Sequence, residues 1–227
     1  MPTAPAPSAK RGRFITLEGG EGAGKSTQLR RLADSLQDSL HARGVELVTT
    51  REPGGSPGAE EIRGLLVTGE TGRWSATTEA LLHTAARRDH LERTVWPALE
   101  AGTWVLCDRF FDSTMAYQGY GLGLGRDLVE TLQTAALGGF RPDLTLILDI
   151  DVETGLRRAV ARHGGEDRYE RMDIGFHQRL RNGFLDIAQR EPERCAVVDA
   201  DADLDTVQAR IWDTVATRLG LPQGLAS

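Results

Sequence analysis

The sequence lacks three features that mark membrane proteins, metal-binding proteins and general nucleic-acid binders. No apolar run approaches the roughly 20 residues that a membrane-spanning helix needs. The two cysteines, Cys107 and Cys195, do not have the spacing of a metal site, and Cys107 is expected to be a small core residue. Asp and Glu outnumber Lys and Arg, 33 to 27, so no excess positive charge is available to neutralise nucleic-acid phosphates. We therefore expect no membrane or nucleic-acid partner and a reducing, cytoplasmic setting.

The chain also lacks an internal repeat and an interdomain linker. Its 227 residues suit one α/β domain with a sizeable core. Residues 1–12 are rich in Pro and Ala and have no apolar core of a secretory signal, so we expect a disordered lead-in. The expected domain spans 13–220, and 221–227 form a tail.

Short apolar runs alternate with helical patterns along the whole chain, which is typical of a buried parallel sheet. The expected strands span 14–18, 45–50, 104–107, 144–148 and 196–198. The expected helices span 25–43, 59–67, 77–100, 126–137, 152–162, 172–189 and 204–219. Gly44 signals the end of the first helix, and Asp203 is a candidate N-cap of the last. The sequence thus predicts an α/β fold with a five-stranded parallel sheet, helices on both faces, and ligands at the carboxyl ends of the strands.

A glycine-rich segment, G-G-E-G-A-G-K-S at 19–26, follows the first expected strand. Glycines let the backbone coil so tightly that several N–H groups face one anion, and the next helix adds the positive end of its dipole. Lys25 is expected to contact the β- and γ-phosphates, and Ser26 to bind Mg²⁺. The predicted nucleoside triphosphate site comprises Gly19, Gly20, Glu21, Gly22, Ala23, Gly24, Lys25, Ser26 and Thr27.

Three other loops follow expected strands and carry polar side chains. The turn R-E-P-G-G-S at 51–56 follows the second strand, and Asp108 and Arg109 follow the third. Asp108 can reach Mg²⁺ through water or orient Lys25, and the planar guanidinium of Arg109 suits a phosphate. The stretch S-T-M-A-Y-Q-G at 113–119 offers hydroxyl, amide and phenol groups that can orient a small polar molecule. We expect all three loops to face the ligand.

Two missing motifs favour phosphoryl transfer over hydrolysis. No glutamate directly follows Asp149, the acidic residue of the fourth strand, although many ATP-driven motors use one to activate water. The Asn-Lys-x-Asp motif that reads guanine in GTPases is also absent. An arginine-rich segment around the Gly164-Gly165 pair, at about 157–171, predicts a mobile lid whose arginines stabilise the transferring charge. Arg162 and Arg168 are the candidates for that contact.

Four segments in this order make the chain similar to bacterial thymidylate kinases, over about residues 13–219. They are F-I-T-L-E-G-G-E-G-A-G-K-S-T-Q from residue 14, T-R-E-P-G-G-S-P from 50, D-R-F-F-D-S-T-M-A-Y-Q-G from 108 and P-D-L-T-L-I-L-D-I from 142. The resemblance implies a P-loop nucleoside monophosphate kinase fold with a short lid. It further implies transfer of the γ-phosphoryl group from ATP to dTMP with Mg²⁺, in a cytoplasmic homodimer.

The resemblance also implies roles for individual residues. Glu21 would contact the sugar of dTMP, Arg109 its phosphate, and Arg87 the edge of thymine. Tyr117 would crowd the 2′ carbon, and Gln118 would lie along the base pocket. The remaining residues of the implied acceptor site are Pro53, His83, Ser113 and Thr114.

Gly22 indicates which branch of the family the chain resembles, and His83 concerns recognition of the base. Gly22 stands where one branch carries an arginine, so the chain resembles the branch that supplies arginine from the lid. His83 stands where the family often has a phenylalanine that stacks on the base; an imidazole can stack too, but base selectivity stays open. Two alternatives remain: a kinase for UMP, CMP or dUMP, and a nucleotide-binding regulator without activity. The residues that weigh against the regulator are Lys25, Ser26, Asp108 and Arg109, and those against the other kinases are Glu21, Arg87 and Tyr117.

Overall fold

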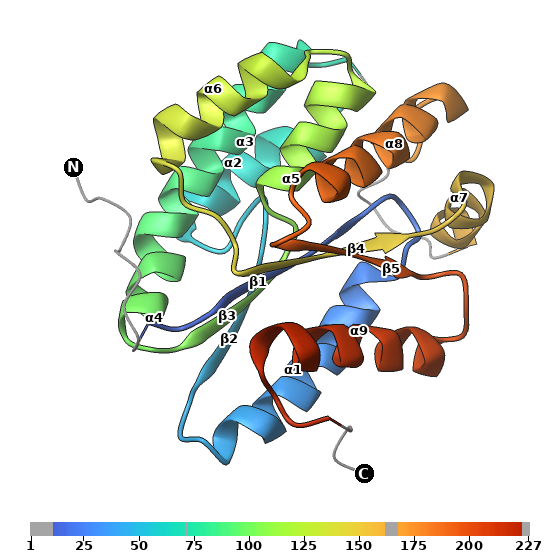
Figure 1. Ribbon diagram of the computed structural model, residues 1–227. Helices are drawn as coiled ribbons and strands as arrows, with labels where there is room; N and C mark the ends of the chain where they lie inside the picture. Colours follow the sequence, from blue (N-terminus) through green and yellow to red (C-terminus); the bar gives the residue numbers. More distant parts are fainter. Residues whose placement is uncertain (1–10, 71, 162–167, 224–227) are drawn as a thin grey trace.

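The computed structural model describes residues 11–70, 72–161 and 168–223 and contains one five-stranded parallel sheet (Figure 1). The strands lie in the order β2-β3-β1-β4-β5. They are β1 (Phe14–Gly19), β2 (Leu47–Arg51), β3 (Trp104–Asp108), β4 (Leu144–Asp149) and β5 (Cys195–Asp199). The predicted sheet is confirmed, and every strand runs one residue further at its carboxyl end than predicted.

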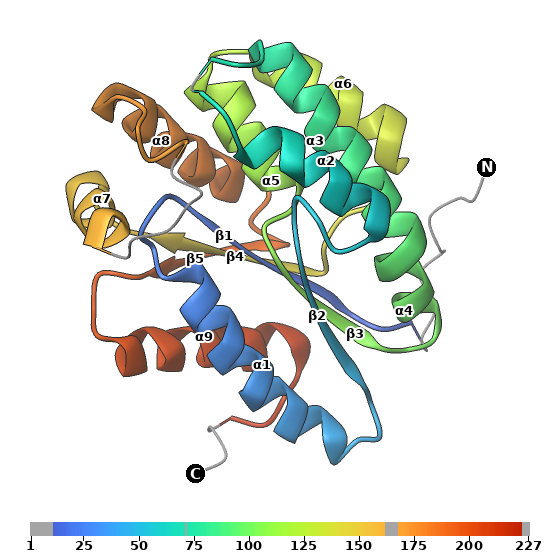
Figure 2. The same cartoon turned by 180° about the vertical axis from the view of Figure 1, so that it is seen from behind.

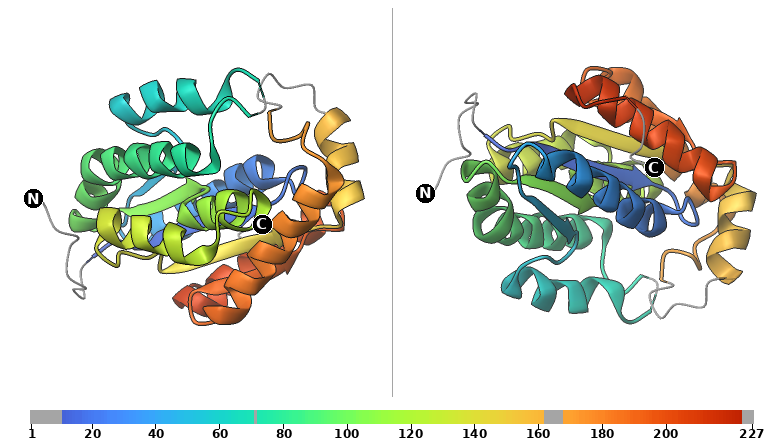
Figure 3. Two further views of the ribbon diagram at one scale, coloured as in Figure 1. Left: turned by 90° about the horizontal axis from the view of Figure 1, so that it is seen from above. Right: turned by 90° about the horizontal axis from the view of Figure 1, so that it is seen from below.

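Helices cover both faces of the sheet (Figures 1 and 2). One face is covered by α1 (Lys25–His41) and α9 (Leu204–Leu219). The other face is covered by α2 (Pro57–Val67), α3 (Ala76–His90), α4 (Trp96–Glu100), α6 (Arg126–Leu137) and α8 (Ile174–Arg190). Another helix, α7 (Val152–Ala161), lies at the opposite end of the molecule from α4 (Figure 3). No helix of the described residues is long and apolar enough to cross a membrane.

The alternation of side chains along β1 divides the core between the two faces. Ile15 and Leu17 pack into the cluster under α1 and α9. Phe14 packs into the aromatic cluster on the other face, and Thr16 lies within hydrogen-bond distance of Thr145, with 2.9 Å between the hydroxyl oxygens. The same alternation carries the next side chain on that face, Glu18, into a fully buried position. β1 therefore delivers a carboxylate to the protein interior immediately before the glycine-rich segment.

Two helical stretches differ from the prediction. The expected helix 77–100 is a continuous run of α3, the π-helical turn η1 (Leu91–Val95) and α4. Pro97 lies in the first turn of α4 and has no N–H to donate to the preceding turn, which accounts for the change in hydrogen-bonding pattern there. The polar stretch 113–119, expected to be a loop, instead lies in α5 (Phe111–Thr114) and the π-helical η2 (Met115–Gly121).

Elsewhere the helices end close to the bounds predicted from the sequence. The last helix has its predicted bounds, and its N-cap Asp203 accepts hydrogen bonds from the N–H groups of Asp205 and Thr206. The first helix ends at His41 rather than Arg43, and Gly44 lies beyond the C-cap with a φ of 67°. Cys107 is fully buried in β3, as predicted.

Candidate functional site

A cavity of about 680 Å³ lies where β1, β2 and β3 end. The loops after these strands line it, together with side chains from α2, α3, α5 and η2. The predicted site residues in its lining are Glu21, Gly22, Gly24, Lys25, Ser26, Thr27, Pro53, His83, Arg87, Asp108, Arg109, Ser113, Thr114, Tyr117, Gln118 and Arg168. Gly19, Gly20 and Ala23 belong to the same loop without lining the cavity, and Arg162 lies outside the described residues. The structure thus brings together residues from five separate segments of the chain.

The glycine-rich segment adopts the tight conformation that its composition predicts. Gly22 and Gly24 have φ angles of 68° and 85°, which side chains other than glycine rarely adopt. Lys25 begins the 17-residue helix α1, and its ammonium group donates to the carbonyls of Gly19 and Gly20 at 3.0 and 2.7 Å. Burial and the nearby Arg109 lower the pKa of Lys25 to about 8, against the attraction of Glu21 and Asp108. The lysine is therefore already at the inner side of the loop, at the start of the helix.

Ser26 and Asp108 form an oxygen pair that fits Mg²⁺. The Ser26 hydroxyl donates to Asp108 Oδ2 at 3.0 Å. The other carboxylate oxygen, Oδ1, is buried and has no hydrogen-bond partner among the described residues. Mg²⁺ prefers oxygen ligands and is commonly held by one or two protein groups together with phosphates and water. These two residues would hold the ion, as the sequence predicts.

Arg109 occupies a strained position at the carboxyl end of β3. Its φ of 69° is the one positive value of a non-glycine residue in the described chain. The guanidinium lies over the Tyr117 ring, 5.0 Å from the centroid, and donates to Glu21 at 3.4 Å and to the Gly19 carbonyl at 3.3 Å. Strain of this kind persists where surrounding contacts impose it, and it clusters at functional sites. Here it directs a guanidinium into the cavity beside the phosphate loop.

Glu21, Arg109 and Tyr117 form one hydrogen-bonded group. The Tyr117 hydroxyl donates to Glu21 at 2.5 Å. Burial opposes ionisation of Glu21, but Arg109, Lys25 and the Tyr117 hydrogen bond outweigh it and lower its pKa to about 2. Burial raises the pKa of Tyr117 well above its usual value, so the phenol keeps its proton and can donate. The predicted neighbours of the acceptor sugar and phosphate are in direct contact.

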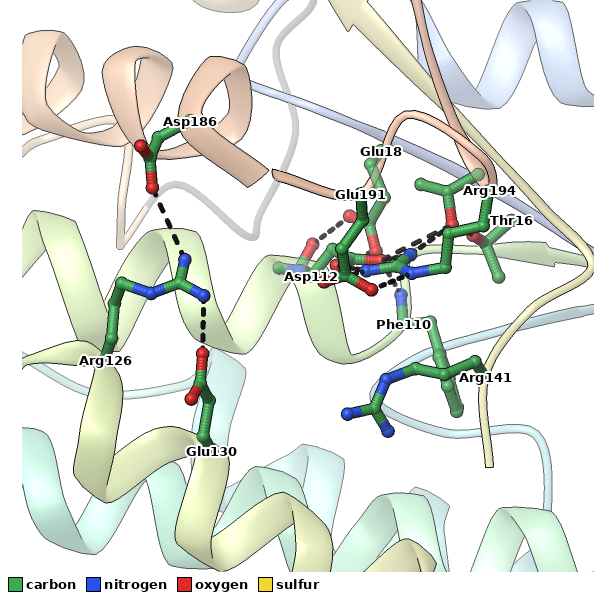
Figure 4. A network of polar contacts seen from close by, with 12 residues as sticks. Thr16, Glu18, Phe110, Asp112, Arg126, Glu130, Arg141, Asp186, Glu191 and Arg194 are labelled. Atoms are coloured by element: carbon green, nitrogen blue, oxygen red, sulfur yellow. Dashed lines mark hydrogen bonds and ion pairs between the residues drawn. The ribbon is translucent and has the colours of Figure 1, made fainter. Parts of the chain in front are cut away.

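Glu18 anchors the beginning of α5, the short helix that carries Ser113 and Thr114 (Figure 4). Its carboxyl group accepts from the Phe110 N–H at 2.7 Å and from the Ser113 hydroxyl at 2.5 Å. Burial and the charge of Asp112 raise the pKa of Glu18 to about 8, against the effect of these donors and of Arg109. Sequence reasoning assigned no role to Glu18 because an isolated glutamate in an apolar strand does not reveal which loop it will contact.

Arg87 is held by a buried ion pair. Its Nε donates to Glu52 at 2.6 Å, and one Nη donates to the Phe110 carbonyl and the Thr114 hydroxyl at 3.1 and 3.0 Å. Its Nη1 group has no hydrogen bond within the described part of the chain and remains available to the cavity that Arg87 lines. Glu52, expected to face a ligand, also contacts His90 at 3.0 Å and so serves to hold the arginine.

His83 lines the cavity one helical turn before Arg87 on α3. Burial, together with the positive charges of Arg87, Arg109 and Arg168, lowers the pKa of His83 to about 3. The imidazole is therefore neutral at physiological pH. It presents an aromatic ring rather than a cation to whatever occupies this part of the cavity.

Arg168 differs from its expected placement. Sequence reasoning put this arginine in the lid, facing the transferring phosphate. In the structure its side chain is 5% exposed, pairs with Glu79 of α3 and donates to the Leu66 carbonyl at 3.0 Å. The guanidinium is thus directed to α2 and α3, and its part in transfer stays a prediction. Glu79 was not predicted at all, since nothing in its local sequence distinguishes it from an exposed helix residue.

The known proteins to which this chain is similar share one description. The family model described as "Thymidylate kinase" matches residues 17–211. The thymidylate kinase of Caulobacter vibrioides is 59% identical over 210 residues, covering 92% of this chain and 99% of that protein. That of Ruegeria pomeroyi is 53% identical, covering 92% and 96% of the two chains. A crystal structure of thymidylate kinase from Ehrlichia chaffeensis superposes with a TM-score of 0.74 at 33% identity, covering 90% of this chain and 99% of that one.

Proposed function

Because the chain belongs to the thymidylate kinase family, we propose that its cavity binds ATP and dTMP side by side and transfers the γ-phosphoryl group between them. The products are ADP and dTDP. The observation that carries the assignment of the cavity is the contact between the phosphate loop and the Glu21–Arg109–Tyr117 group. One member of that group, Glu21, belongs to the loop itself, so donor and acceptor sites share a wall.

The donor site is formed by the loop and the start of α1. The loop backbone and Lys25 hold the triphosphate, and Ser26 and Asp108 supply oxygen ligands. Mg²⁺, when bound, neutralises part of the charge on the phosphate oxygens. Lys25 Nζ lies on the Gly19 and Gly20 carbonyls and exchanges these contacts for phosphate oxygens when ATP enters.

The acceptor site is formed by side chains from β3, α3, α5 and η2. Arg109 binds the monophosphate of dTMP, and Glu21 contacts its sugar. Tyr117 fills the space beside the 2′ carbon and disfavours ribonucleotides. Arg87 offers its free Nη1 group to the base edge, and the neutral His83 offers a stacking surface. Pro53, Ser113, Thr114 and Gln118 complete the lining.

Transfer in this site needs no strong general base. The attacking group is a phosphate monoester that is already ionised near neutral pH. Catalysis then consists of in-line positioning and of neutralising charge on the moving phosphoryl group, which Lys25 and Arg109 provide. Arginines of the segment 157–171 add to this charge, in keeping with the branch of the family that supplies arginine from the lid.

One assay tests the assignment against its alternatives. The protein is incubated with ATP, Mg²⁺ and a panel of monophosphates, namely dTMP, dUMP, UMP and CMP, and ADP and diphosphate are quantified. We expect dTMP to be strongly preferred. Preference for another acceptor would identify a different nucleoside monophosphate kinase, and the absence of turnover with every acceptor would indicate a regulator.

We also propose that the protein is a cytoplasmic homodimer. Three helices that pack side by side each expose one large leucine: Leu65 on α2, Leu81 on α3 and Leu128 on α6, with exposures of 41%, 49% and 40%. Contiguous apolar surface is what a second subunit would cover, so these exposed leucines on neighbouring helices support an interface there. We place the dimer interface on the face that these three helices form.

A further inference from the structure

One buried carboxylate borders the acceptor part of the cavity without belonging to any recognised motif. Glu79 lies in the first turn of α3 and its side chain is 1% exposed. His83 and Arg87 follow on the same helix at intervals of four residues, so the three side chains share one helix face. Glu79 therefore belongs to the side of α3 that faces the acceptor.

The Glu79 carboxylate accepts hydrogen bonds from side chains of two distant segments of the chain. Its Oε1 accepts from Arg168. Its Oε2 accepts from Gln118 Nε2 at 3.1 Å and from the Tyr169 hydroxyl at 3.0 Å. Gln118 Nε2 also donates to the Tyr169 hydroxyl at 3.1 Å, which closes a ring of three hydrogen bonds. Burial and the neighbouring Glu79 raise the pKa of Tyr169, so its hydroxyl remains a donor to the carboxylate.

This ring of hydrogen bonds determines the orientation of the Gln118 side-chain amide. A carboxylate can only accept hydrogen bonds, so it binds the NH₂ end of the amide and repels the oxygen end. The amide oxygen Oε1 is consequently turned away from Glu79. It is buried and has no partner among residues 11–70, 72–161 and 168–223, while Gln118 itself lines the cavity.

We propose that Glu79 is a positioning residue that fixes the Gln118 amide with its oxygen as the free acceptor in the base pocket. This inference rests on the proposed function, in which that pocket holds the base of dTMP. A fixed acceptor favours a base that carries a ring N–H, as thymine does at N3, over cytosine, whose N3 is itself an acceptor. Loss of the Glu79 charge lets the amide rotate and present its NH₂ group, which suits cytosine equally well.

The same carboxylate links the base pocket to the chain that follows the predicted lid. Arg168 and Tyr169 come directly after the segment 162–167, and both are bound to Glu79. A buried carboxylate with an arginine partner holds that partner firmly, because separating them would leave an uncompensated charge. Glu79 thus joins the group that reads the base to the two residues that directly follow the segment 162–167.

The test is Glu79→Gln, which keeps the size of the side chain and removes its charge. The measured quantity is the ratio of kcat/KM for dTMP to kcat/KM for dCMP. We expect this ratio to fall about tenfold or more, as for loss of a base-specific hydrogen bond, with a higher KM for dTMP and an unchanged KM for ATP. Glu130→Gln is the charge-matched control, because Glu130 pairs with Arg126 on α6 outside the cavity. We expect its ratio to equal that of the wild type.

A double-variant cycle separates positioning from general support of the fold. If Glu79 acts through the amide, Glu79→Gln lowers the ratio in the wild-type background and leaves it nearly unchanged in the Gln118→Met background. An equal fall in both backgrounds would overturn the inference. Should Glu79→Gln alone fail to fold, Glu79→Gln/Arg168→Met removes both charges of the ion pair and is compared with Arg168→Met alone.

The outcomes also distinguish this inference from the proposed function. A wild-type protein that does not prefer dTMP would refute the acceptor assignment itself. A wild-type preference for dTMP that persists in folded Glu79→Gln would refute the role of Glu79 alone.

Discussion

Lys25 is the residue on which phosphoryl transfer should depend most. It is buried at the start of α1 and hydrogen-bonded to two loop carbonyls. We predict that Lys25→Ala lowers dTDP formation about a hundredfold to a thousandfold, which is the loss typical of removing one preorganised donor from such a site. The fold should persist, because the neighbouring buried carboxylate of Glu21 keeps its hydrogen bonds from Arg109 and Tyr117. Unchanged dTDP production in the variant would contradict the donor assignment.

The ionisation of Glu21 makes the folding stability of the unliganded protein depend on pH. Its pKa is lowered to about 2 from 4.5 despite burial, because Arg109, Lys25 and Tyr117 favour the ionised form. The stability that Glu21 contributes is therefore complete above about pH 4.5 and is lost as pH falls toward 2. The pKa difference corresponds to about 3 kcal/mol at most.

We predict that Glu21→Gln removes this part of the acid dependence. Unfolding by urea, measured between pH 3 and pH 7, should show the wild type losing its advantage over the variant as pH decreases. A difference between the two proteins that stays constant over this range would mean that Glu21 is not held by the Arg109 charge.

At the scale of elements, α7 lies directly against the phosphate loop. A Cβ added at Gly22 would lie 1.8 Å from the Gly155 carbonyl oxygen, and one added at Gly155 would lie 2.5 Å from the Glu21 carbonyl oxygen. Neither backbone leaves room for a side chain. α7 thus occupies the space that an arginine at position 22 would need, which is consistent with glycine at this position.

Gly155→Ala should separate α7 from the loop. We predict a loss of about 1–3 kcal/mol in the free energy of unfolding, as for other overpacked contacts, and a raised KM for ATP. Gly64→Ala in α2 is the matched control, because nothing lies within 4 Å of its added Cβ. That substitution should be neutral or stabilise by about 0.5–1 kcal/mol. Equal ATP KM values in the two variants would contradict a functional contact.

The helix α5 is tied to β5 by a buried ion pair (Figure 4). Arg194 binds the fully buried Asp112 with two hydrogen bonds of 2.9 and 2.8 Å and also contacts Thr145 at 3.0 Å. Arg194→Met leaves the Asp112 charge without its partner, so we predict a loss of about 3–5 kcal/mol in urea unfolding. Asp112→Asn/Arg194→Met should recover most of that loss; a double variant as unstable as the single one would refute this reading of the pair.

At the scale of the whole molecule, the exposed leucines of α2, α3 and α6 predict self-association. We expect a dimer in light scattering at micromolar concentration and a monomer for Leu81→Asp, because a charge in an apolar interface cannot be solvated. Leu204→Asp is the control, since Leu204 is similarly exposed, at 53%, at the start of α9 on the opposite face. A monomeric wild type would refute the proposed homodimer.

The sequence by itself determined the parallel sheet, the phosphate loop and the family of this protein. Buried strands, glycine turns and helix caps are specified by residues close to one another in the chain, so Lys25, Ser26 and Asp203 could be interpreted locally. The grouping of Arg109 with Glu21 also followed from the resemblance to a known family.

Only the tertiary structure decided the contacts of Glu18, Glu79 and Arg168. A buried carboxylate takes its function from the donors that surround it, and these donors come from segments far away in the sequence. The same holds for α5 and η2, whose polar sequence has no helical periodicity and whose first N–H groups are satisfied by Glu18 of β1. Charge neutralisation between distant segments, unlike strand and turn formation, has no local signature.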